Sequence, residues 1–352
     1  MAAVLHVVAS TDRRGAELFG QQLHEALSER GWRSQIVALA AGSGAGLDIE
    51  SLGPTRRHRR TLTALRRRAA GVDIVVAHGS TTLPVCSLAL LASGTPFVYR
   101  NIGDPNHWVT TARRRLQGAV LHRRARHIVA LTPTTVDRLQ AKYRLSAGRI
   151  TAIPKGVPLE SFPPTNPERR HKGRTMLDVA DNVPLVVYLG ALGPEKLIEN
   201  AIAAIGDLPS VALAIVGDGP ERDRLHALAA PHDPRIRLVG ATSEPGLVLA
   251  AADLVVQPSA TEGLPGTLIE AGLVGVPSVA TDVGFVSDIV VDDDVGTLVP
   301  PHNVAALRKA IKARLDDDRP VSADARADLM NRYGLDQMVA SWETVLRQAI
   351  SS

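Results

Sequence analysis

The sequence predicts an α/β protein built from two parallel-sheet domains in tandem. Apolar strand-like runs alternate with helical segments through both halves, which is the pattern of parallel βα units. A segment rich in proline and charge, at 159–174, interrupts the alternation once and is interpreted as an exposed linker. A chain of 352 residues also exceeds a comfortable single core. We therefore place an N-terminal domain at 1–165, a C-terminal domain at 166–335, and a C-terminal amphipathic helix at 336–352 that can pack back on the N-terminal domain.

The first half begins with a buried-strand candidate, AVLHVVA, followed by a polar turn and the helical segment LFGQQLHEALSERG, which ends at Gly31. Further strand candidates are SQIVALA, DIVVAHG, TPFVYRN and HIVALTP, with two basic helices and one apolar helix between them. ITAIPKGVP closes this half. The glycines of AGSGAG lack the spacing of the dinucleotide-binding fingerprint and no helix clearly follows them, so we interpret this segment as a flexible loop.

The second half restarts the alternation with VPLVVYLG and continues through the strand candidates VALAIVGDGP and IRLVG. It then reaches the stretch LVVQPSATEGLPGTLIEAGLVGVPSVAT, which has the pattern strand, Gly/Pro loop, helix, strand. The loop places backbone N–H groups near a helix start, at Gly263, Leu264 and Gly266. Unpaired donors and the helix dipole favour a phosphate at such a position.

Two carboxylates, Glu262 and Glu270, flank this candidate anion site. Since a carboxylate repels a phosphate, we expect these side chains to accept hydrogen bonds from the hydroxyls of an attached sugar. The stretch therefore predicts a site for a sugar phosphate or a nucleotide sugar. Two tandem α/β domains also predict a cleft between them, at the carboxyl ends of the strands.

The net charge of +4 hides an asymmetry, because arginine clusters at 56–68 and 113–126 both fall in the first half. Such clusters can hold phosphates or anionic lipid headgroups, or can simply be solvated helix faces. Nucleic acid is not expected as a partner, since no aromatic residues interleave with the arginines. We find no apolar run long enough to span a bilayer and no signal peptide, so we expect a cytoplasmic protein, with peripheral contact to the inner face of an anionic membrane as a hypothesis.

The single cysteine, Cys86, lies in the apolar segment PVCSLALLA and is predicted to be a buried structural thiol. The Cys and His residues have no spacing that suits a metal cluster, so no metal site is expected.

Several ordered blocks carry a family resemblance. They are HVVASTDRRGAE, IPKGVP, LGALGPEK, VGDGPER, the end of IRLVG, and PSATEGLPGTLIEAGLVGVPSVATDVG with its two glutamates separated by seven residues. In their order and spacing they resemble the retaining glycosyltransferases of family 4 (glycosyl transferases group 1), which have the GT-B fold of two facing Rossmann-like domains. The resemblance implies a metal-independent, cofactor-free hexosyltransferase of carbohydrate biosynthesis. It would move a sugar from a nucleoside diphosphate (a UDP- or GDP-sugar) to a hydroxyl acceptor.

The resemblance also implies roles in donor binding. Glu270 would bind the ribose hydroxyls, and Glu262 the hydroxyls of the transferred sugar. Lys196 would neutralise the diphosphate and stabilise the leaving group, so Lys196 and Glu262 are the implied catalytic residues. Val239 and Gly240 would lie near the base. The implied donor-binding set is Gly190, Lys196, Val239, Gly240, Glu262, Gly263, Leu264, Gly266, Thr267, Leu268 and Glu270.

Candidate acceptor or cleft residues come from the first half: Gly15, Ala16, His78, Arg100, Asn101 and Asp104. His78 ends an apolar strand, and a structural histidine is the alternative interpretation. Three positions depart from the family pattern: Ala191 stands where an arginine is usual, Arg14 stands where glycine is common, and Asn101 stands nearest to where many members carry a histidine. Ala191 and Asn101 leave open a non-catalytic nucleotide-sugar-binding or scaffold protein. A GT-B-like nucleotide-sugar epimerase, which would share the fold, is a second alternative.

Overall fold

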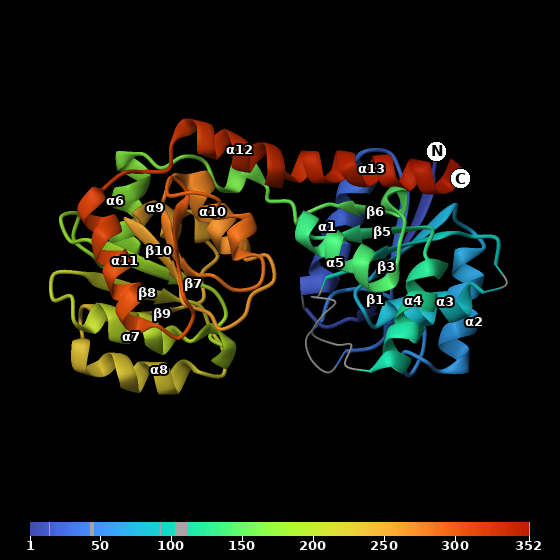
Figure 1. Ribbon diagram of the computed structural model, residues 1–352, viewed down its shortest axis with the longest axis horizontal. Helices are drawn as coiled ribbons and strands as arrows, with labels where there is room; N and C mark the ends of the chain where they lie inside the picture. Colours follow the sequence, from blue (N-terminus) through green and yellow to red (C-terminus); the bar gives the residue numbers. More distant parts are fainter. Residues whose placement is uncertain (14, 43–45, 92, 103–110, 352) are drawn as a thin grey trace. The chain divides into compact units, whose positions relative to one another are not determined.

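The computed structural model consists of two compact units (Figure 1). It describes residues 1–13, 15–42, 46–91, 93–102 and 111–351. The first unit comprises Met1–Lys155 together with Asp336–Ser352, and the second comprises Gly156–Leu335. The chain thus leaves the first unit earlier than the expected boundary at 165. The reason is that Val157 pairs with Gly334, and that Phe162 is buried in the core of the second unit.

The first unit contains a six-stranded parallel sheet with the order β2-β1-β3-β4-β5-β6. Its strands are β1 (Ala3–Ser10), β2 (Arg33–Ala40), β3 (Ile74–His78), β4 (Phe97–Arg100), β5 (His127–Ala130) and β6 (Ile150–Ala152). Its helices are α1 (Gly15–Glu29), α2 (Arg59–Ala69), α3 (Thr82–Ala89), α4 (Ala112–Arg124), α5 (Pro133–Tyr143), the short η1 (Ala147–Arg149) and α13 (Leu335–Ser351).

The central strands of this sheet are buried, as expected of a parallel sheet that helices cover. β3, β4 and β5 are buried at every position. Cys86 lies inside α3 and is fully buried, and this burial raises the pKa of its thiol to about 12. The prediction of a buried structural cysteine is therefore confirmed.

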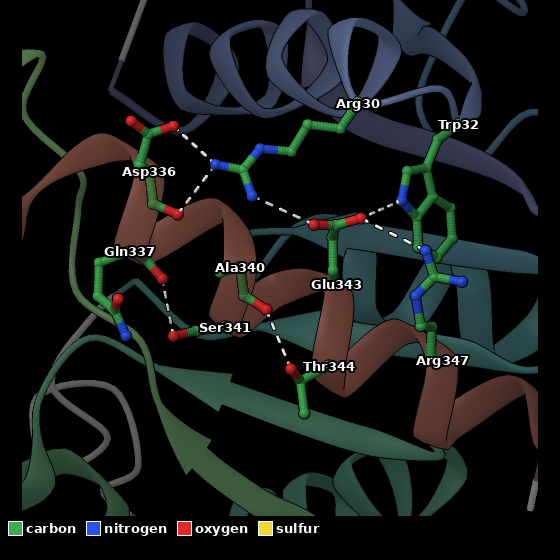
Figure 2. Close-up of polar contacts among 9 residues, drawn as sticks. All are labelled: Arg30, Trp32, Asp336, Gln337, Ala340, Ser341, Glu343, Thr344 and Arg347. Carbon is green, nitrogen blue, oxygen red and sulfur yellow. Dashed lines mark hydrogen bonds and ion pairs between the residues drawn. The ribbon is translucent and has the colours of Figure 1, made fainter.

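Helix α13 is part of the first unit although it follows the second unit in the sequence (Figure 2). Its Trp342 is fully buried, with its ring centroid 6.3 Å from that of Phe19. Glu343 accepts hydrogen bonds from the indole N–H of Trp32 at 2.8 Å and from Arg30 at 3.2 Å. An apolar anchor and a carboxylate with two donors thus hold this helix against α1 and the start of β2.

The second unit also contains a six-stranded parallel sheet, with the order β12-β11-β10-β7-β8-β9. Its strands are β7 (Leu185–Leu189), β8 (Ala212–Val216), β9 (Ile236–Gly240), β10 (Leu254–Gln257), β11 (Ser278–Thr281) and β12 (Gly296–Val299). Its helices are α6 (Pro167–Met176), α7 (Ile198–Gly206), α8 (Arg222–Ala229), α9 (Pro245–Ala251), α10 (Gly266–Val274), α11 (Val304–Asp317) and α12 (Ala323–Tyr333). Four single turns complete it: η2 (Leu159–Ser161), η3 (Pro194–Lys196), η4 (Ala230–His232) and η5 (Val286–Asp288).

Successive residues of β7 belong to opposite cores, as the pleat of a strand requires. Val187 packs in one cluster with residues of α9, α10 and α12, and Val186 packs in a second cluster with residues of α7, α8 and α11. The sheet is therefore a central layer between two layers of helices, the doubly wound arrangement that the sequence predicts.

The prediction of an exposed linker at 159–174 is wrong, because this segment contains α6. Asn166 caps the helix by accepting a hydrogen bond from the N–H of Arg169 at 2.8 Å, and Pro167 occupies the first turn. Arg174 is fully buried, donates to Asp253 at 2.7 Å, and also donates to the carbonyls of three residues. The segment is thus part of the core of the second unit.

Because all strands in each sheet are parallel, their carboxyl ends lie along one edge. In open parallel sheets this edge is where ligands bind. Most of the candidate site residues follow these strand ends. Among the described helices, none combines the length and the apolar character needed to cross a bilayer.

Candidate functional site

A cluster of polar side chains surrounds Glu262, in the loop between β10 and α10. Its Oε1 atom accepts hydrogen bonds from Lys196 Nζ at 2.8 Å, Gln257 Nε2 at 2.5 Å and Ser259 Oγ at 2.7 Å. The Glu262 side chain is 7% exposed and that of Lys196 is 19% exposed. One nearly buried carboxylate oxygen therefore holds a cation and two neutral donors at the carboxyl edge of the sheet.

Backbone bonds bring the two loops that carry Lys196 and Glu262 together. Lys196 ends the turn η3, and the following Leu197 adopts a left-handed conformation with φ 45°. The N–H of Ala260 donates to the carbonyl of Glu195 at 2.8 Å, which ties η3 to the loop after β10. This backbone bond helps to bring Lys196 and Glu262 together, although they are 66 residues apart in the sequence.

The backbone of Gly284 packs closely against the loop that carries Glu262. Gly284 has φ +61°, and a Cβ atom added there would lie 1.9 Å from the carbonyl oxygen of Glu262. The N–H of Phe285 also donates to the carbonyl of Gly263 at 3.3 Å. Only a residue without a side chain permits this close approach, so Gly284 fixes the position of the loop.

Helix α10 begins at this loop and points its first turn at the same region. Pro265 is the N-cap and supplies no side-chain acceptor to the first amides of the helix. Thr267 Oγ1 donates to the carbonyl of Leu189 at 3.1 Å, which fixes the helix start to the end of β7. Gly263 faces open space, whereas the side chain of Leu268, in the first turn of α10, is buried. The amides at this helix start are thus held rigidly beside an open surface.

The remaining predicted donor residues lie on neighbouring strand ends. The N–H of Gly190 donates to the carbonyl of Val216 at 3.0 Å, and that of Gly217 donates to the carbonyl of Gly240 at 2.8 Å. Gly217 has φ +148°, and an added Cβ atom would lie 1.8 Å from the Gly190 carbonyl oxygen. The ends of β7, β8 and β9 therefore approach each other closely.

Three further residues of the predicted donor set differ in exposure. Val239 is 42% exposed at the end of β9. Leu264 and Glu270 are half-buried, and Glu270 lies about one turn into α10. The structure thus brings the predicted donor residues to one edge of one sheet.

The structure adds residues that the sequence analysis missed. Gln257 and Ser259 both donate to Glu262, and Gly284 supports its backbone. Tyr188 OH donates to the carbonyl of Ala191 at 2.8 Å, and burial together with the charges of Glu262 and Glu195 raises its pKa. Two features of the sequence could have indicated these donors. Gln257 is a polar residue at the end of the apolar run LVVQ, and Ser259 precedes Glu262 by three residues.

The first unit gathers a second set of residues at the carboxyl edge of its own sheet. His78 and Arg100 are register partners at the ends of β3 and β4. Gly79 follows with φ +84°, and a Cβ atom there would lie 3.2 Å from Ile102 and 3.8 Å from Ala16. Gly15 and Ala16, at the start of α1, therefore lie near these strand ends.

Asn101 is buried next to Arg100. Its N–H donates to the carbonyl of Val129 at 2.8 Å, and its side-chain oxygen accepts from Tyr99 OH at 3.3 Å. Asp104 lies outside the described residues.

The side chain of His78 points into the interior, where its Nε2 atom lies 3.0 Å from Nδ1 of His6. Both rings are fully buried. Burial lowers the pKa of His6 to about 3, and burial together with His6 and Arg100 lowers the pKa of His78. The guanidinium of Arg100 stacks on the Phe19 ring at 3.5 Å, and burial lowers its pKa to about 9. The histidine pair is therefore neutral near pH 7, whereas Arg100 keeps its charge.

Comparison with known proteins identifies families for both units. The family described as glycosyl transferases group 1 matches residues 172–332, and the one described as Glycosyltransferase Family 4 matches residues 13–161. The 2-deoxystreptamine N-acetyl-D-glucosaminyltransferase of Streptomyces fradiae is 32% identical over 234 residues, which are 63% of this chain and 55% of that protein. The D-inositol 3-phosphate glycosyltransferase of Xylanimonas cellulosilytica is 32% identical over 241 residues, 63% of this chain and 57% of that protein. The chain spans about half the length of these curated relatives.

Solved structures show the same fold. Alr3699/HepE of Anabaena, in complex with UDP, superposes with a TM-score of 0.85 at 22% identity and covers 99% of this chain and 100% of its own. The same protein in complex with UDP-glucose gives a TM-score of 0.83. These likenesses and the two six-stranded parallel sheets establish the GT-B fold with its Rossmann-like domains. Since the family matches cover nearly all of both units, the chain belongs to the group 1 glycosyltransferases.

Proposed function

We propose that this protein is a retaining, metal-independent glycosyltransferase that moves a sugar from a nucleoside-diphosphate donor to a hydroxyl acceptor. The observation that carries the proposal is the cluster of Lys196 and Glu262 beside the first turn of α10. A glycosidic bond to a diphosphate breaks as negative charge builds on the leaving oxygen. A fixed cation and preorganised amides stabilise that charge.

Each donor group has an assigned partner in this proposal. The amides from Gly263 to Thr267 and the Lys196 ammonium bind the diphosphate. Glu262 exchanges one of its present donors for a hydroxyl of the transferred sugar, and Glu270 binds the ribose. Val239 and Gly240 lie under the base. A UDP-sugar is the first donor to test, because the Anabaena relative is described in complex with UDP and UDP-glucose.

Retention needs no strong enzymic base in this scheme. The acceptor oxygen attacks the anomeric carbon on the face from which the diphosphate departs, and a departing phosphate oxygen takes the acceptor's proton. Lys196 supplies the positive charge that a metal ion provides in other transferases. The protein's contribution is then positioning and leaving-group stabilisation.

We assign acceptor binding to the carboxyl edge of the first unit, with Gly15 and Ala16 at the start of α1 and with the buried side chains of His78, Arg100 and Asn101 beneath them. Asp104 belongs to the same proposal. The acceptor panel begins with 2-deoxystreptamine and D-inositol 3-phosphate, because the names of two relatives contain these compounds.

The test measures release of nucleoside diphosphate from UDP- and GDP-sugars, with and without acceptor, in the presence of EDTA. We expect acceptor-dependent release that EDTA leaves unchanged, and an anomeric configuration in the product that matches that of the donor. Lys196→Ala and Glu270→Ala should lower release by about a hundredfold or more, whereas Lys172→Ala, at an exposed lysine of α6, should not. Full turnover in both site variants would refute the assignment.

Ala191 is the reason to consider functions other than sugar transfer. The usual cation is missing at this position, and the Ala191 carbonyl is already bonded to Tyr188. A non-catalytic nucleotide-sugar-binding or scaffold protein would bind donor in calorimetry without turnover on any acceptor. An epimerase would convert the donor sugar without acceptor, which mass spectrometry and NMR of the product detect.

We further propose peripheral contact with an anionic membrane face through α3 and α4. Leu88, Leu91, Leu116 and Val120 are 53–67% exposed there. Three of them line a hollow of about 650 Å³ together with Arg57. Exposed apolar side chains beside arginines match an anionic bilayer surface. Leu116→Ser should reduce flotation with phosphatidylglycerol vesicles, whereas Leu228→Ser, at an exposed leucine of α8, should not. Equal flotation of both variants would count against this contact.

A further inference from the structure

A second concave site lies in the first unit, at the amino ends of its strands. This cavity of about 670 Å³ is lined by residues at the starts of β4, β5 and β6, by the end of α3, and by Gln348 and Ala349 of α13. Phe97 and His127 are the first residues of β4 and β5, and Arg149 directly precedes β6. His78 and Arg100 occupy the opposite ends of β3 and β4. The cavity is therefore separate from the edge to which we assign acceptor binding.

The cavity is strongly cationic. Arg123, Arg124, Arg126 and Arg149 all line it, and no aspartate or glutamate is found among its described lining residues. In the part of the chain that the structure describes, none of these four arginines forms an ion pair. Four arginines thus line one hollow with no carboxylate among its described lining residues to neutralise them.

Backbone carbonyls hold three of these arginines in place. Arg123 donates to the carbonyl of Tyr143 at 3.2 Å, and Arg124 donates to that of Leu90 at 3.4 Å. Arg149 donates to the carbonyl of Arg123 at 2.9 Å and also to that of Ala125. Carbonyls restrict the side chains but leave their charge uncompensated, so less rotamer freedom is lost when an anion binds.

The floor of the cavity contributes no further charge. His127 is buried, and one of its ring nitrogens lies 2.9 Å from Thr151 Oγ1. Burial and the neighbouring Arg149 both lower the pKa of His127, which keeps the ring neutral near pH 7. The positive charge is therefore concentrated in the guanidinium groups at the wall and rim.

We propose that this arginine pocket binds a phosphate-bearing anion, either a soluble phosphate compound or the headgroup of an anionic phospholipid. Guanidinium groups bind phosphate oxygens in pairs, and several uncompensated ones favour a ligand with more than one negative charge. The proposal depends neither on sugar transfer nor on the donor site, because every lining residue belongs to the first unit.

Gly148 provides a test that separates charge from size. It lines the pocket, and a Cβ atom added there would meet nothing within 4 Å. Gly148→Glu introduces a carboxylate at the rim, and Gly148→Gln introduces a neutral side chain of the same size. Arg126→Gln removes one cation from an exposed side chain. Arg33→Gln is the control, since Arg33 is an arginine at the start of β2 that lies outside the pocket.

The probe is inorganic pyrophosphate, followed by NMR of the backbone amides of Gly94 and Thr95, which line this pocket, are unchanged in every variant and do not belong to the donor site. We expect saturable shifts of both amides, weakened at least tenfold by Gly148→Glu and by Arg126→Gln. Gly148→Gln and Arg33→Gln should bind as the unmodified protein does. Thermal unfolding of each variant verifies that it is folded.

Vesicles containing phosphatidylglycerol form the second arm, scored by flotation in the Leu116→Ser background so that the apolar patch contributes less. Pyrophosphate binding without charge-sensitive flotation identifies a soluble phosphate as the ligand. Flotation that Gly148→Glu abolishes and Gly148→Gln retains identifies the lipid headgroup. If neither probe distinguishes Gly148→Glu from Gly148→Gln, the proposal is wrong.

Discussion

Replacement of Lys196 by alanine tests the central feature of the proposed mechanism. At 2.8 Å, the ammonium of Lys196 and the carboxylate of Glu262 attract each other by about 6 kcal/mol at an effective dielectric constant of about 20. Desolvation of both groups offsets much of this attraction in the free protein. If the ammonium also stabilises the departing diphosphate, its removal should lower kcat by about 10²–10³-fold, the usual effect of losing one such donor.

A second effect can also lower kcat in Lys196→Ala. The Glu262 carboxylate loses its cation in this variant, and its negative charge would repel a diphosphate. A double-mutant cycle with Glu262→Gln distinguishes the two causes. If Lys196 acts on the leaving group, Lys196→Ala lowers kcat by a similar factor in the unmodified protein and in the Glu262→Gln variant. Steady-state release of nucleoside diphosphate at saturating donor provides kcat for the four proteins. A double variant as active as Glu262→Gln alone would refute the catalytic role of Lys196.

Three further predictions concern stability. Arg174→Met should destabilise the second unit by about 3–5 kcal/mol in urea unfolding, because it removes the fully buried cation that donates to Asp253 and to three carbonyls. Arg170→Met, which removes a more exposed partner of the same carboxylate, should cost under about 1 kcal/mol; equal losses would contradict this ranking. Gly217→Ala should lower the melting temperature and weaken donor binding together, since its Cβ atom would lie 1.8 Å from the Gly190 carbonyl oxygen; wild-type values of both would contradict the geometry. His6, whose pKa burial lowers to about 3, binds a proton near pH 6.5 only when the chain unfolds. Stability should therefore be full above about pH 6.5 and fall below it, by up to about 1.4 kcal/mol per pH unit for this residue. Urea midpoints that stay constant from about pH 7 to about pH 5 would contradict that account.

The architecture could be predicted from the sequence because strand and helix periodicities are local properties. Both sheets are parallel, as the alternation of apolar and amphipathic segments indicates. The prediction of an exposed linker at 159–174 failed because proline and polar residues are common both in linkers between domains and at the first turn of a helix. The residue types alone therefore could not reveal α6. Only the burial of Arg174 against Asp253 decides between a linker and a helix, and that contact links positions 79 residues apart.

The candidate donor site was predictable in outline for a different reason. Lys196 and Glu262 follow two strands that pair directly, β7 and β10, so their loops must meet at one edge. The roles assigned to these residues remain predictions. Gln257 and Ser259 were missed because their role depends on where their side chains point. Both donate a hydrogen bond to Glu262, and residue type and spacing do not predict that orientation. The burial of His78 against His6 was also inaccessible, since a histidine inside an apolar strand shows no partner in the sequence.

The position of α13 has a consequence for biosynthesis. The first unit buries Trp342 in its core, yet the ribosome makes this residue only after it has made the whole second unit. The second unit is contiguous and can finish folding while the first still lacks its last helix. Until α13 docks, the surfaces around Phe19 and His78 that Trp342 covers are open to water. The N-terminal half is therefore the last part of this chain to mature, and a nascent chain that stalls before Trp342 would present an apolar surface to chaperones.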